Sequence, residues 1–129
     1  MTTELTMLVM GVGLLMLSLI IQATAGVISN GLVTQAGSRD GLPEPRVFHA
    51  RATRLRANMM ENLLLFAPLV LVAHLAGITN DMTVLGAQLF VFGRLGHGII
   101  YLAGWPLVRP LFFAIAWAGL IMIASQLFG

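Results

Sequence analysis

Four long apolar segments dominate this chain of 129 residues, and they restrict its possible folds more than any other feature. They cover about residues 5–28, 57–76, 82–103 and 106–128, so each is about 20 residues or longer. A helix of that length spans the ~30 Å hydrocarbon core of a bilayer. Charged residues make up only 9% of the chain, against about 25% in a soluble domain, so lipid must be its main solvent.

Backbone polar groups in lipid must pair within the protein, and four spans of this length can do so only as helices. We therefore predict an all-α, integral membrane four-helix bundle formed by a single domain, residues 1–129. The helices are expected over about 5–28, 50–76, 82–103 and 106–128, with Pro106 at the first position of the last one. In that last helix Ala114 and Ala118, four residues apart, are small enough to allow close helix packing.

The arginines predict the orientation in the membrane. The loop at residues 29–50, rich in turn formers, and the start of the next helix carry five of them: Arg39, Arg46, Arg51, Arg54 and Arg56. Arg109 follows the third loop. Basic residues favour the cytoplasmic side, so loops one and three should be cytoplasmic and both termini non-cytoplasmic. In a prokaryote the membrane would be the bacterial inner membrane.

The second helix carries a polar face inside the membrane, where charged residues are costly and need a reason. Arg54, Asn58 and Glu61 are spaced i, i+4, i+7 and therefore share one face, which Arg51 extends by one turn. We expect Arg46 and Arg56 to be solvated determinants of topology, and His49 to lie in the loop.

The third helix carries a matching face formed by Arg94, His97 and Tyr101, spaced i, i+3, i+7. Both polar faces are expected in the cytoplasmic half of the bilayer, where they can meet each other or line a wet cavity. A purely structural alternative is a buried ion pair between Glu61 and either Arg94 or Arg54. Such an ion pair would not explain why the two faces also carry several other cations and Asn58.

The side chains on these faces suit a zwitterionic ligand. Guanidiniums pair bidentately with carboxylates, and Glu61 can accept an ammonium group. Glutathione, with two carboxylates, an ammonium, two amides and a thiol, is complementary, although many zwitterions would satisfy the same groups. The chain has no cysteine, so any thiol must come from a substrate. The three histidines form no metal-binding motif, and no basic run suggests nucleic acid.

At these residues the sequence resembles the MAPEG family, the membrane-associated proteins of eicosanoid and glutathione metabolism. Arg54-x3-Asn58-x2-Glu61 resembles the family's most specific motif, and Arg94-x2-His97-x3-Tyr101 resembles its prostaglandin E synthase branch. Arg109 falls where the family places a thiol-facing arginine. The resemblance implies a homotrimer with glutathione bound between subunits. It also implies that Arg54, Asn58, Glu61, His97, Tyr101 and Arg109 line the glutathione site.

We therefore expect a glutathione-dependent membrane transferase or peroxidase that attacks lipophilic electrophiles through a bound thiolate. Arg109 and Tyr101 are the expected catalytic residues, and the expected binding residues are Arg51, Arg54, Asn58, Glu61, Arg94 and His97. One alternative is a non-catalytic, lipid-binding protein of the same fold. Another is a small four-helix transporter, which would need a coupling carboxylate in the first helix, where no charge follows Glu4.

Overall fold

Four helices make up the fold in a computed structural model that describes residues 1–31, 37, 47–104 and 108–128. They are α1 (Thr3–Asn30), α3 (Val47–Leu75), α4 (Asp81–Ala103) and α5 (Arg109–Phe128). All four are long and apolar enough to cross a membrane. The all-α, four-helix membrane fold predicted from the sequence is therefore confirmed. Pro106, predicted to begin the last helix, lies outside the described residues.

Local sequence explains where these helices begin and end. Thr2 caps α1 by accepting a hydrogen bond from the backbone N–H of Leu5 at 3.2 Å. Asn80 and Thr83 form a reciprocal capping box at the start of α4. Gly104 ends α4 with a φ of +80°, a left-handed conformation that favours glycine.

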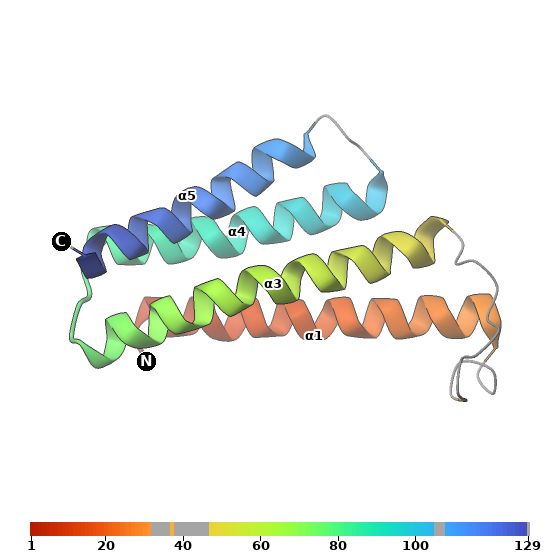
Figure 1. Cartoon of the computed structure of the whole chain (residues 1–129), viewed down its shortest axis with the longest axis horizontal. Coiled ribbons are helices and arrows are strands. Elements are labelled where there is room, and N and C mark those ends of the chain that lie inside the picture. Colours follow the sequence, from red (N-terminus) through yellow and green to blue (C-terminus); the bar gives the residue numbers. More distant parts are fainter. Residues whose placement is uncertain (32–36, 38–46, 105–107, 129) are drawn as a thin grey trace.

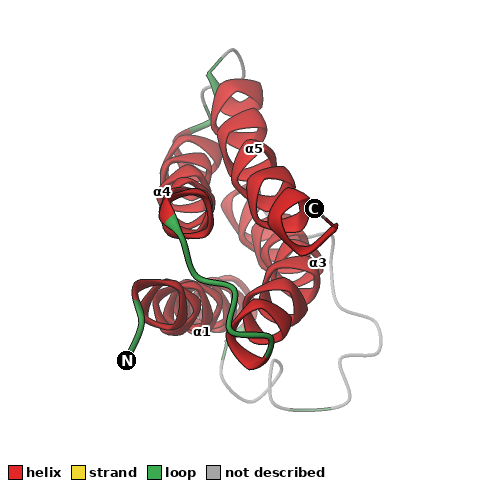
Figure 2. Cartoon of the chain, turned by 90° about the vertical axis from the view of Figure 1, so that its left-hand side faces the viewer, coloured by secondary structure: helices red, strands yellow, loops and turns green. Residues whose placement is uncertain are grey.

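The helices are arranged as two antiparallel pairs (Figure 1). α1 packs mainly on α3, and α4 packs mainly on α5, while α4 also contacts both helices of the first pair, α1 and α3 (Figure 2). Both termini and the α3–α4 turn lie at one end of the bundle, and the start of α3, the end of α4 and the start of α5 lie at the other (Figure 1). The second end therefore holds the arginines near the start of α3 together with Arg109.

Small residues bring α4 and α5 close together. Gly86, Gly93, Ala116 and Gly119 are all buried at this contact. Ala114 and Ala118, expected from the sequence to pack closely, are exposed on the chain surface instead. A shift of two residues turns a helix by about 200°, so Ala116 lies on nearly the opposite face from these two alanines.

Substituting Gly93 with alanine should destabilise the bundle by about 1–3 kcal/mol. A Cβ there would lie 2.7 Å from the backbone nitrogen of Ala116, so the two helices would have to move apart. Gly13→Ala is the matched control, because nothing lies within 4 Å of a Cβ at that position. Thermal unfolding in detergent compares the two variants, and equal loss of stability would contradict the α4–α5 packing described here.

Candidate functional site

Tyr101, near the end of α4, is the centre of a polar cluster to which three helices contribute. The Nε–H of Arg54, from α3, donates a hydrogen bond to the Tyr101 hydroxyl at 2.8 Å. The Arg109 guanidinium, from α5, lies over the Tyr101 ring with its carbon 5.3 Å from the ring centroid. His97 precedes Tyr101 by one helical turn, and their rings stack with centroids 5.7 Å apart. We call Arg54, His97, Tyr101 and Arg109 the Tyr101 cluster.

The Tyr101 cluster is suited to an anion. The Tyr101 oxygen accepts a hydrogen bond from Arg54, which leaves its own O–H free to donate. Arg109 is the first residue of α5, where the helix dipole adds partial positive charge. Arg54 and Arg109 are both exposed, so a ligand can reach the two guanidiniums from outside the chain.

Arg51, Asn58 and Glu61 extend the site along α3. The Arg51 guanidinium packs against the end of α4, because a Cβ on Gly104 would lie 2.9 Å from its Nη1. The side-chain oxygen of Asn58 accepts a hydrogen bond from the amide of Asn62 at 3.0 Å. Glu61 is exposed and has no hydrogen-bond or ion-pair partner within the described part of the chain.

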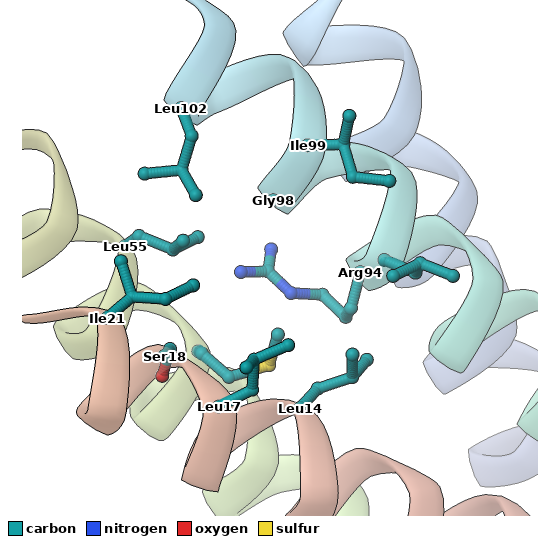
Figure 3. Close-up of a pocket in the computed structure, with 11 residues that line it drawn as sticks. Leu14, Leu17, Ser18, Ile21, Leu55, Arg94, Gly98, Ile99 and Leu102 are labelled. Carbon is teal, nitrogen blue, oxygen red and sulfur yellow. The ribbon is translucent and has the colours of Figure 1, made fainter.

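The structure therefore lacks the ion pair considered as a structural alternative. Arg54 binds Tyr101, and Glu61 pairs with neither Arg54 nor Arg94. Arg94 is fully buried, and none of its three nitrogens has a hydrogen-bond partner among the described residues. Its guanidinium points into a separate apolar cavity (Figure 3). Arg94 is therefore not part of the Tyr101 cluster, although the sequence predicted that it shares a polar face with His97 and Tyr101.

A second polar network joins α1 to α3 at the same end of the bundle. The Nε–H of Arg56 donates to Gln22 at 3.0 Å, and Gln22 donates in turn to Thr53 at 3.3 Å. Arg56 is half-buried rather than freely solvated, and His49 is buried at the start of α3 rather than in the loop. Sequence reasoning overlooked this network, although an amide within an otherwise apolar span was a signal for it.

Comparison with protein families gives a match over nearly the whole chain. The sequence matches the MAPEG family over residues 5–129. No curated protein and no solved structure matches it. The family match covers all four helices and the Tyr101 cluster. The chain is therefore a multi-pass membrane protein that belongs to the MAPEG family.

Proposed function

We propose that this protein is a glutathione-dependent membrane transferase or peroxidase acting on lipophilic electrophiles. The observation that carries the proposal is the Tyr101 cluster, which places two guanidiniums from different helices beside one phenol. Permanent cations next to a hydrogen-bond donor lower the free energy of a thiolate relative to the thiol.

The residues present suit the chemical groups of glutathione. Arg51 and Arg54 would bind carboxylates, and Asn58 would bind an amide. Glu61, exposed and without a partner in the described chain, would accept the ammonium group. The Tyr101 cluster would receive the thiol end. Arg54 and Asn58, one turn apart on α3, define the direction in which an extended peptide would lie.

The proposed reaction begins with ionisation of the thiol. Arg109 is always protonated, so it cannot accept the proton, which passes to water while the guanidinium stabilises the anion. Tyr101 or His97 would donate a further hydrogen bond to the sulfur. In a transfer, the thiolate electron pair forms the sulfur–carbon bond, and the leaving group departs with the electron pair of the broken bond.

A homotrimer would complete this site. Arg54, Glu61 and Arg109 lie exposed on the single chain, so a second copy is free to cover them. Enclosure between subunits would exclude water and strengthen the interactions of these charges with a ligand. We propose that glutathione binds between adjacent subunits.

We also propose that the end of the bundle holding the Tyr101 cluster is cytoplasmic. Both termini lie at the opposite end (Figure 1), so both should be non-cytoplasmic, and periplasmic in a bacterial inner membrane. Terminal fusions to a reporter that is active only in the cytoplasm should remain silent at either end. Signal from such a fusion would reverse the orientation.

The alternative function is lipid binding without catalysis, which the apolar cavity around Arg94 favours. An assay of the purified protein with glutathione and a chlorinated aromatic acceptor tests the two. We expect formation of the thioether above the uncatalysed rate. Glutathione binding without turnover of several acceptors and hydroperoxides would favour the lipid-binding alternative.

A further inference from the structure

Asn62 is a buried amide near the middle of α3, one residue past Glu61. Its side-chain nitrogen donates two hydrogen bonds, to the main-chain carbonyl of Asn58 at 2.8 Å and to the side-chain oxygen of Asn58 at 3.0 Å. Its own side-chain oxygen is buried and has no hydrogen-bond partner among the described residues. An amide at this place needs an explanation, because polar groups inside a membrane are costly.

Helix packing does not provide that explanation. Buried amides in membrane proteins commonly form hydrogen bonds to another helix and hold the two helices together. Both hydrogen bonds that Asn62 forms with described residues remain within α3, so they join no two helices of the chain. The unpaired oxygen adds a further cost to the folded state. The residue that Asn62 does contact is Asn58, which is proposed to bind glutathione.

The contact fixes the orientation of both amides. A main-chain carbonyl can only accept, so the Asn62 group beside it must be the NH2 group. The same NH2 group faces the Asn58 amide, where only the oxygen can accept. The Asn58 oxygen is therefore held on Asn62, while the Asn58 NH2 group has no partner within the described ranges. Asn58 is half-buried and lies between Arg54 and Glu61 along α3, so this NH2 group is available to a ligand.

We propose that Asn62 is a positioning residue that keeps the NH2 group of Asn58 directed at the ligand, so that the site selects a carbonyl oxygen there. The inference rests on the proposed function and specifies which half of a peptide amide the protein recognises. A peptide C=O would accept from Asn58, whereas a peptide N–H would meet another N–H group. Arg54 would hold a carboxylate on one side of that carbonyl, and Glu61 the ammonium group on the other.

Analogues of glutathione separate the two halves of the amide. In an ester analogue, oxygen replaces one peptide N–H and the carbonyl remains. In an alkene analogue, a trans double bond replaces the whole amide. Each analogue is made at either peptide bond, and isothermal titration measures its binding to the full-length protein in phosphatidylcholine nanodiscs.

At one of the two peptide bonds, the alkene should bind roughly three- to tenfold more weakly than glutathione, which corresponds to the loss of one hydrogen bond. The ester at the same bond should lose less affinity, because its carbonyl still accepts from Asn58. Equal losses for ester and alkene at that bond, or no loss for the alkene at either bond, would overturn the proposal.

Variants assign the effect to Asn62. Asn62→Leu removes the donor, so the Asn58 amide can rotate, and the affinity ratio of glutathione to alkene should fall toward one. A general loss of folded protein does not change this ratio, because it compares two ligands on one protein. Ser18→Ala is the matched control, since the buried Ser18 hydroxyl also donates only within its own helix, to the Leu15 carbonyl at 2.7 Å. The control should keep the wild-type ratio, and a wild-type ratio in Asn62→Leu would overturn the role of Asn62.

Hydrogen exchange of the side-chain amides tests the orientation without any ligand. The chain has four asparagines, at positions 30, 58, 62 and 80, so NMR of protein labelled at asparagine can follow each one. The NH2 protons of Asn62 should exchange slowly with water, and those of Asn58 should exchange fast. The reverse pattern would overturn the proposed orientation even if glutathione binds. Wild-type protein that binds no glutathione would instead overturn the proposed function, and with it the ligand assigned to Asn58.

Discussion

Replacing Arg109 with alanine should raise the pKa of a bound glutathione thiol and reduce the thiolate present at pH 7 by roughly ten- to thirtyfold. A free cysteine thiol has a pKa of about 8.5, and a neighbouring cation lowers that value because it favours the anion. Removing the cation therefore shifts ionisation to higher pH. The rate of thioether formation at pH 7 should fall by a similar factor, since the thiolate is the nucleophile.

Two measurements separate this effect from a general loss of the site. At a pH low enough to keep the bound thiol protonated, affinity for glutathione should change little in Arg109→Ala, because Arg51, Arg54, Asn58 and Glu61 would remain. Arg109→Lys should keep the thiol pKa closer to the wild-type value, because the positive charge is retained. If wild type and Arg109→Ala ionise the thiol at the same pH, Arg109 is not the activating group.

Replacing Glu61 with glutamine should weaken glutathione binding roughly tenfold or more, without lowering thermal stability in detergent. The carboxylate would lose its charge-assisted contact with the ammonium group of the ligand. Stability should not change, because Glu61 is exposed and has no ion-pair partner in the part of the chain that the structure describes. Isothermal titration and thermal unfolding measure the two quantities.

Asp81→Asn is the matched control for this experiment. Asp81 is another exposed carboxylate, at the start of α4 and therefore at the opposite end of the bundle. The control should bind glutathione as wild type does. A Glu61→Gln variant with normal affinity and reduced stability would show that Glu61 has a structural role and does not bind the ligand.

The fold was predictable because each membrane-spanning helix can be recognised from its own apolar sequence. Apolar length alone identifies four membrane helices, and Asn80 and Gly104 mark helix ends by local chemistry. The packing faces were not predictable. α5 is apolar all round, so its sequence cannot show that Ala116 and Gly119 face α4 while Ala114 and Ala118 do not.

Helical spacing in the sequence predicts which residues of the candidate site share a helix face. It does not predict the direction in which a long side chain extends from that face. Helical spacing placed His97 and Tyr101 together, and the family resemblance implied that Arg54 and Arg109 line the same site. The structure has all four in contact around Tyr101. Arg94 shares the same face by spacing, but its flexible side chain turns into the cavity beside α1. Which neighbour an arginine contacts depends on the packing of helices distant in sequence.

The central claim, that this protein binds glutathione and ionises its thiol, is tested most directly by a pH titration of the wild-type complex. Thiolate absorbs ultraviolet light that the thiol does not, so the difference spectrum between complex and separate components reports ionisation. We predict that the thiolate signal is present at pH 7 and disappears only on acidification, because the Tyr101 cluster lowers the thiol pKa below its free value. A complex that shows no thiolate signal until the pH exceeds about 8.5, as for a free thiol, would contradict the claim.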